Sequence, residues 1–220
     1  MQATHSSVIA WWLIALLLPG SLSLQSHERH TAFIGYHEHP ATSLQDVVVL
    51  SSTYGQISLK LRPELSPKVV SLVKQLASSG QKCNACKFYR HEPVPQSWGR
   101  DSFYGPPYAL LQGSLADMAH QPPFEGSPAV KKGDACIIPN TREFFIATAD
   151  HGEWGHSHTV WGQVADEASW QVIARIPTGP YTSRTDGAIT TRWLTPEATV
   201  PFNISLEQQR QTQESKLQPS

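Results

Sequence analysis

The feature that most limits the fold is a series of short apolar segments separated by turns that contain glycine or proline. The chain has 17 Pro and 14 Gly in 220 residues, which favours many turns and a β-rich fold over a helical bundle. Ile57, Leu59 and Leu61 alternate with polar residues, as in a half-buried strand. We therefore expect strands over 46–50, 54–63, 87–91, 107–112, 134–138, 143–148 and 159–164.

Two segments have helical spacing instead. Apolar residues recur at i, i+3, i+4 and i+7 within residues 66–80, where Ser66 suits the N-cap and Gly80 suits the position after the helix. A second helix is expected over residues 167–176. Two helices among this many strands predict a mainly β fold, a closed antiparallel barrel capped by helices.

The first residues have the pattern of a secretory signal. The apolar core spans residues 8–18, whereas a membrane span needs about 17–25 apolar residues and a signal core about 7–15. Ser21 and Ser23 have the −3/−1 spacing that signal peptidase accepts. We expect residues 1–23 to be a signal peptide; the alternative is an uncleaved anchor through residues 8–24, which makes a single-pass membrane protein. Both routes lead into the secretory pathway, to its lumen or outside the cell.

The remaining boundaries follow from composition. Residues 24–44 are expected to be a linker, residues 45–200 the folded domain and residues 201–220 a disordered polar tail rich in glutamine. Asn203 begins an Asn-Ile-Ser sequon, so we expect a glycosylation site there.

The charge balance excludes one class of partner. Lys and Arg number 17 and Asp and Glu 18, for a net charge of −1. A nucleic-acid-binding protein needs a basic excess to neutralise phosphates, so nucleic acid is not expected as a partner.

The three cysteines predict a single bridge and leave its pairing open. Cys83 and Cys86 form a C-x-x-C pattern, but it follows a helix and precedes a strand, the reverse of the thioredoxin-like context. A zinc site lacks further ligands at suitable spacing. In an oxidising lumen we expect a disulfide, either Cys83–Cys86 or one of them with Cys136, and a buried thiol at the remaining position.

A metal enzyme is the rival interpretation from another class. His156 and His158 form an H-x-H pattern, which on a strand places two imidazoles on one face. The next acid along the chain is Asp166, too far away to complete a ligand set. No metal or other cofactor is therefore expected.

Four segments, in order along the chain, resemble the cyclophilins, which are peptidyl-prolyl cis-trans isomerases. They are GQISLKLRPELSPKVVSLVKQL (55–76), FYRH (88–91), EFFIATAD (143–150) and EWGHSHTVWGQV (153–164), and the match covers about residues 45–180. The resemblance implies a closed, eight-stranded antiparallel barrel capped by two helices.

The resemblance also implies the site residues. Arg90 takes the place of the catalytic arginine. Phe145 corresponds to the aromatic residue that packs on the substrate proline, and Trp154 to a tryptophan important for cyclosporin binding. The positions that bind substrate in the family correspond to Leu110, Gln112, Glu143, Phe145, Trp154 and His158.

The implied reaction needs neither a nucleophile nor a metal. Rotation about an X-Pro bond breaks amide resonance and crosses a barrier of ~18–20 kcal/mol. In the twisted bond the prolyl nitrogen regains a lone pair, and a guanidinium that donates to it stabilises the twisted form selectively. The resemblance thus implies an isomerase, acting as a monomer on proline-containing polypeptides during folding in the secretory pathway.

This sequence departs from the family at several pocket positions. Ala109 replaces a phenylalanine, Glu143 a glutamine and Gly155 a leucine, while the loop at 139–142 is short. We expect weaker proline binding as a result, and a carboxylate at Glu143 that pairs with Arg90 and holds it away from substrate. The alternative function is a catalytically weak module that binds proline-containing segments of a lumenal or membrane partner.

Overall fold

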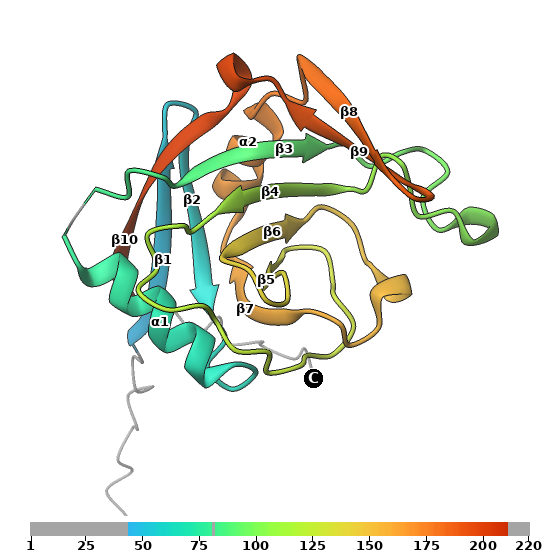
Figure 1. Ribbon diagram of the computed structural model, residues 1–220. Coiled ribbons are helices and arrows are strands. Elements are labelled where there is room, and N and C mark those ends of the chain that lie inside the picture. The colour runs from blue at the N-terminus through green and yellow to red at the C-terminus, as the bar shows by residue number, and fades with distance from the viewer. Residues whose placement is uncertain (1–43, 81, 211–220) are drawn as a thin grey trace, which may run out of the picture. The chain divides into compact units, whose positions relative to one another are not determined.

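The structure is a computed structural model that describes residues 44–80 and 82–210 (Figure 1). The predicted signal peptide, nearly all of the predicted linker and residues 211–220 lie outside this part of the chain. Within it, no helix is both long enough and apolar enough to cross a membrane.

Eight strands form a closed antiparallel barrel in the order β1-β10-β3-β4-β6-β5-β7-β2. This confirms the predicted fold class, a mainly β barrel with two α-helices. The barrel strands are β1 (Leu44–Ser52), β2 (Gly55–Leu61), β3 (Lys87–Glu92), β4 (Leu110–Ser114), β5 (Asp134–Ile137), β6 (Glu143–Ala147), β7 (Thr159–Val164) and β10 (Val200–Arg210).

The two α-helices lie where their apolar spacing predicts them. Helix α1 (Pro67–Ser78) packs against β7 and β10, and α2 (Glu167–Arg175) packs against β2. Helix α2 is capped by Asp166, whose carboxylate accepts a hydrogen bond from the amide of Ser169 at 2.7 Å. The described chain also contains short 3₁₀ turns η1 (Arg100–Ser102), η2 (Gly152–Trp154) and η3 (Pro196–Ala198).

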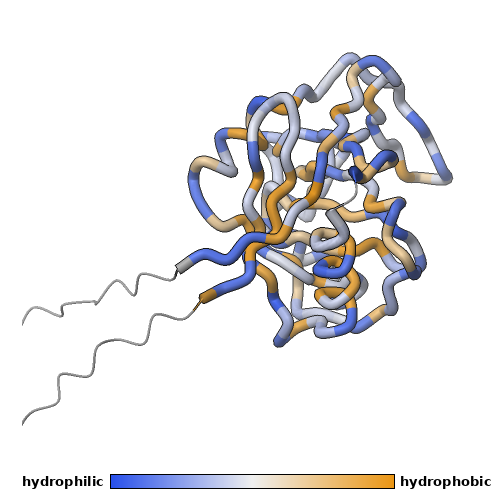
Figure 2. The backbone as a smooth tube through the Cα atoms, turned by 90° about the vertical axis from the view of Figure 1, so that its left-hand side faces the viewer, coloured by the Kyte–Doolittle hydropathy of each residue, from blue (hydrophilic) through white to orange (hydrophobic). Residues whose placement is uncertain are grey.

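The barrel interior is filled by aromatic side chains from neighbouring strands. The rings of Phe88 and Phe202 lie 4.6 Å apart, and Phe144 contacts both of them and Trp161. Burial of each such side chain contributes about 1.5–3 kcal/mol. Figure 2 shows apolar positions interspersed with polar ones along the barrel strands, as expected when one face of each strand meets the core.

Strand β10 corrects the predicted boundary of the domain. Residues 201–210, expected to belong to a disordered tail, are part of β10: residues 202–210 pair with the whole of β1, and Pro201 pairs with Lys87 on β3. The reason is that Phe202, Ile204 and Leu206 alternate with polar residues and supply an apolar face to the core. Asn203 lies on the opposite face of this strand and is exposed, so glycosylation there stays a prediction.

A β-hairpin outside the barrel was not expected from the sequence. Strands β8 (Tyr181–Asp186) and β9 (Ile189–Leu194) form a separate two-stranded sheet that packs on β3 (Figure 1). Every residue of β8 is exposed, so its sequence carries no apolar alternation. Gly187, at φ 58°, supplies the left-handed conformation that the turn requires.

Candidate functional site

A bulge in β3 brings two side chains to the outer face of the barrel. The pairing of β3 with β4 shifts between Phe88 and Arg90, so Tyr89 is an extra residue in the strand. Phe88 remains in the core, while Tyr89 and Arg90 both contact Gln112 on the neighbouring strand. A bulge redirects side chains in this way, and bulges are frequent beside active sites.

Close packing between β3 and β4 requires the glycine next to Gln112. A Cβ atom on Gly113 would lie 2.8 Å from the carbonyl oxygen of Lys87 and 3.0 Å from the rings of Phe88 and Phe144. Only glycine therefore lets β4 approach β3 closely enough to keep this register.

Arg90 is held by two side chains. Its Nη1 donates to Oε1 of Gln112 at 2.9 Å, and its Nε donates to Oε1 of Glu92 at 2.7 Å. Gln112 in turn donates through Nε2 to the hydroxyl of Tyr89 at 2.5 Å. The Arg90 side chain is only 11% exposed and lies 5.4 Å from the centre of the Tyr108 ring. The predicted catalytic arginine and the predicted glutamine are thus in direct contact.

Glu92 was not expected from the sequence, yet it organises this part of the site. Its side chain is fully buried and pairs with Arg90. The same carboxylate accepts hydrogen bonds from the amides of Tyr108 and Arg192, each at 2.8 Å. It therefore fixes Arg90, the loop before β4 and strand β9 relative to one another.

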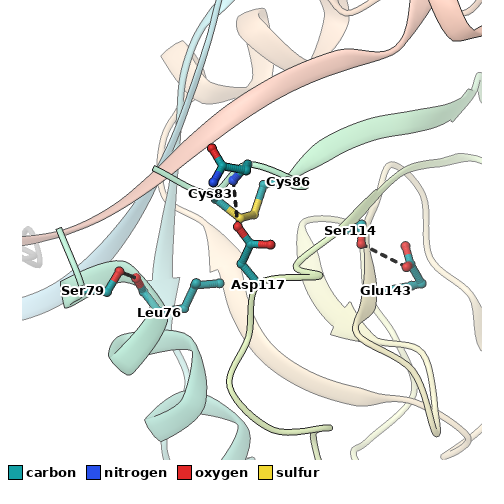
Figure 3. The surroundings of a disulfide bond; sticks show 8 residues. Leu76, Ser79, Cys83, Cys86, Ser114, Asp117 and Glu143 are labelled. Atoms are coloured by element: carbon teal, nitrogen blue, oxygen red, sulfur yellow. Dashed lines mark hydrogen bonds between the residues drawn. A yellow bond between two sulfur atoms is a disulfide. The ribbon is translucent and has the colours of Figure 1, made fainter. Parts of the chain in front are cut away.

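Glu143 does not pair with Arg90, so that expectation is wrong. It lies opposite Ser114 in the β4–β6 ladder, and the Ser114 hydroxyl donates to its Oε1 at 3.0 Å (Figure 3). Its other oxygen, Oε2, is buried and has no hydrogen-bond partner among the described residues. Burial, together with the negative charge of Glu143, raises the pKa of Tyr89 well above its usual range.

Phe145 lies directly opposite Gln112 in the same ladder. Its ring centre is 5.1 Å from those of both Trp154 and His158. Leu110 is buried in the same small cluster. The structure thus brings together five of the predicted substrate-binding residues, Leu110, Gln112, Phe145, Trp154 and His158, whereas Glu143 lies two residues further along β6, against Ser114.

His151 is a second residue that sequence reasoning missed. It is fully buried and stacks on the Trp154 ring, with centres 3.7 Å apart and planes inclined by 9°. Its ring nitrogens contact Oε1 of Glu153 at 2.8 Å and the carbonyl oxygen of Ala109 at 3.2 Å. Trp98 packs edge-on against it at 4.9 Å. This arrangement lies over Phe145, which is only 1% exposed.

His158 is uncharged at neutral pH. Burial lowers its pKa to about 4, and the nearby His151 acts in the same direction. Its Nδ1 lies 3.0 Å from the hydroxyl of Ser157. It therefore adds a neutral polar group, able to accept or donate one hydrogen bond, beside the aromatic cluster.

Two of the departures from the family pattern, Ala109 and the short loop at 139–142, each adopt a defined backbone conformation. Ala109 is buried in a left-handed conformation, φ 50°, and its carbonyl oxygen also accepts from the amide of Thr148 at 2.9 Å. In the short loop, the amide of Thr141 donates to Ile138 at 3.2 Å with Asn140 at φ 60°, a tight turn between β5 and β6.

The structure selects one of the two predicted cysteine pairings. Cys83 and Cys86 form a disulfide in the segment that leads into β3 (Figure 3). The amide of Asn84, between them, donates to the Asp117 carboxylate at 2.7 Å. Cys136 is a free, buried thiol, and burial raises its pKa well above its usual range.

The histidine pattern lies in a different setting from the one considered for a metal site. His156 and His158 belong to the turn before β7 and not to a strand, and His156 contacts the carbonyl oxygen of Ser127. Within residues 44–80 and 82–210, no group of three or more His, Cys, Asp or Glu is arranged to hold a metal ion.

Comparison with known proteins gives structural matches alone. No family model matches the chain. No curated protein matches it either. Two similar solved structures are crystal structures of a cyclophilin-type peptidyl-prolyl cis-trans isomerase of Cryptosporidium parvum, one of them with the dipeptide Ala-Pro. Each is 14% identical with a TM-score of 0.48, covering 73% or 75% of this chain and 98% of the other. The closed eight-stranded barrel with two α-helices is the architecture that the sequence predicts.

Proposed function

We propose that the protein is a peptidyl-prolyl cis-trans isomerase that accelerates X-Pro rotation in polypeptides of the secretory pathway. The observation that carries the proposal is the placement of Arg90. Its guanidinium is hydrogen-bonded to Gln112, and Gln112 lies directly opposite Phe145 in the β-sheet. A donor for the prolyl nitrogen, a group for the peptide backbone and an apolar surface for the ring are thereby adjacent.

In this mechanism Arg90 stabilises the twisted amide. Its bonds to Glu92 and Gln112 use Nε and Nη1, which leaves Nη2 to donate to the prolyl nitrogen. That nitrogen has an available lone pair only when the bond is twisted, so the interaction favours the transition state over either planar isomer. Each tenfold of acceleration takes about 1.4 kcal/mol of such selective stabilisation.

Substrate binding then requires a movement at the aromatic cluster. Phe145 is 1% exposed, so a proline ring reaches it only after the stacked His151 and Trp154 swing outward. Trp154 belongs to η2 and Gly155 follows it, at φ 52°. A short turn that ends at a glycine is a suitable element to carry such a movement.

Binding without catalysis is the second candidate function, and two observations favour it. The fully buried carboxylate of Glu92 pairs with Arg90 and offsets its charge. Phe145 is covered in the structure. A site of this kind could hold a proline-containing segment of a lumenal or membrane partner while stabilising the twisted amide poorly.

The cellular location is part of the proposal. The apolar segment at 8–18 supports entry into the secretory pathway, through a cleaved signal or an anchor. The Cys83–Cys86 disulfide supports an oxidising compartment.

Exchange NMR on an Ala-Pro-containing peptide tests the function. We expect the chain, expressed through a secretory host, to speed cis-trans exchange above the spontaneous rate, and both Arg90→Ala and Arg90→Lys to lose that effect. Arg100→Ala, which removes an exposed arginine outside the site, is the matched control. Peptide binding detected by shift changes, without faster exchange, would establish the binding module instead.

A further inference from the structure

A groove lies beside the Arg90–Gln112–Tyr89 network. It has a volume of about 630 Å³ and lies between the β8–β9 hairpin and the outer face of β3, β4 and β6. Figure 1 shows the hairpin lying beside β3 on this side of the barrel. The side chains that matter here are Lys87, Tyr89, Ser114, Glu143, Arg184 and Trp193.

The strand register places the groove next to the proposed proline site. Gln112 faces Phe145 across β4 and β6, and two residues further along the same strands Ser114 faces Glu143. Lys87 is opposite Ser114 on the other side. Two residues of strand span about 7 Å, and an extended peptide rises at the same rate. A peptide whose proline lies at Phe145 therefore places a residue two or three positions away over the groove.

One wall of the groove presents a fixed cation. The guanidinium of Arg184 packs on the Trp193 ring, 4.0 Å from its centre, and Trp193 stacks on Tyr89 at 4.8 Å. Tyr89 is itself held by Gln112. This three-layer stack connects the hairpin to the Arg90 network and orients Arg184 at the groove.

A second cation, Lys87, also lines the groove. Lys87, on β3, is exposed. Neither Lys87 nor Arg184 forms an ion pair with another described residue. Two cations without ion-pair partners line the groove and outnumber its one carboxylate, Glu143, so the groove complements a negatively charged side chain.

Glu143 supplies the polar floor. Its Oε1 accepts a hydrogen bond from the Ser114 hydroxyl, its Oε2 is buried, and the carboxylate also acts on the neighbouring Tyr89 hydroxyl.

We propose that this groove is a subsite for the polypeptide that flanks the proline, and that Lys87 and Arg184 select an acidic side chain two or three residues from it. The inference rests on the proposed function, because it takes Phe145 as the position of the proline.

Peptide binding tests the subsite without depending on turnover. The probes are Ala-Pro-containing peptides with Glu, Gln or Lys placed two or three residues before or after the proline, titrated at low salt. We expect one Glu position to bind roughly three- to tenfold more tightly than Gln, because exposed ion pairs are individually weak. The difference should shrink as salt is raised.

A double charge reversal, Lys87→Glu with Arg184→Glu, supplies the decisive comparison. We expect it to reverse the preference from the Glu peptide to the Lys peptide. Lys68→Glu, on the exposed face of α1, is the control for overall charge and should keep the original preference. Equal affinities for all peptides, or an unchanged preference in the reversed variant, would overturn the inference.

Two further outcomes separate this inference from the proposed function. Tight binding of the Glu peptide without faster cis-trans exchange would leave the subsite standing and remove the isomerase. If the wild type prefers the Lys peptide, the negative charge of Glu143 is the selecting feature and the two cations are not, which contradicts the inference.

Discussion

The imidazole of His151 stacks on the indole of Trp154, with ring centres 3.7 Å apart and planes inclined by 9°. Both rings also lie against Phe145. The side chain on which a proline would pack is therefore covered by two side chains of the chain itself. His151 was not singled out by the sequence, and it packs with Trp154 against Phe145, which was.

Removal of this cover should increase affinity for proline-containing peptides. We expect His151→Ala to lower the Kd of an Ala-Pro peptide several-fold, because binding no longer has to displace a stacked ring. The carbonyl oxygen of Ala109 keeps its bond from the Thr148 amide, so the variant leaves no unpaired group there. Titration followed by NMR measures the change, with His120→Ala, at an exposed position, as control. Unchanged or weaker binding in His151→Ala would contradict this role.

Loss of the buried carboxylate of Glu92 should destabilise the whole domain. The side chain is 0% exposed and neutralises Arg90, while its oxygens also accept from the amides of Tyr108 and Arg192. We expect Glu92→Gln to lower the free energy of unfolding by about 3–5 kcal/mol, because a buried charge is left unpaired. Urea denaturation measures the loss.

An exposed ion pair serves as the control for Glu92. Glu64 pairs with Arg62 and its side chain is 58% exposed, so Glu64→Gln should cost less than about 1 kcal/mol. Comparable losses in the two variants would show that burial of Glu92 contributes little.

The sequence alone was sufficient for most of the barrel and for part of the site. Alternation found strand β2, and helical spacing found α1, because one face of each element meets the core. The apolar pattern could not reveal β8, because every residue of that strand is exposed and neither face is apolar. Strand β10 did carry the alternation of Phe202, Ile204 and Leu206, but the glutamines that follow obscured it.

Within the site, the sequence identified residues that share a strand face and missed those defined by tertiary contacts. Arg90 belongs to one of the segments that resemble a family and Gln112 lies at a position that the resemblance assigns, and the β-bulge brings the two together. Glu92 acts on the amide of Arg192, 100 residues away, and no local pattern encodes that contact. The same holds for His151, whose partners include the carbonyl of Ala109.

The disulfide should contribute modestly to stability. Cys83 and Cys86 close a short loop, since they are separated by 3 positions in sequence. The chain-entropy relation gives about 2 kcal/mol for a loop of this length. We expect the double variant Cys83→Ser with Cys86→Ser to lower the free energy of unfolding by that amount and to keep the fold. Urea denaturation with native near-UV circular dichroism checks both, and Cys136→Ser alone is the comparison for an unbonded cysteine.

Mild acid should destabilise the domain through His158. Its pKa is about 4 in the folded chain, lowered by burial and by the nearby His151, against about 6.5 in the unfolded chain. Between these values the unfolded state binds more protons, so stability is complete above pH ~6.5 and falls as the pH drops toward ~4. We expect the urea midpoint to fall between pH 7 and pH 4.5, and to fall less in His158→Gln. Burial also lowers the pKa of His91, which acts in the same direction and is present in both proteins. An equal fall in the wild type and in His158→Gln would assign the effect to other groups, and His91→Gln would then be the variant to compare.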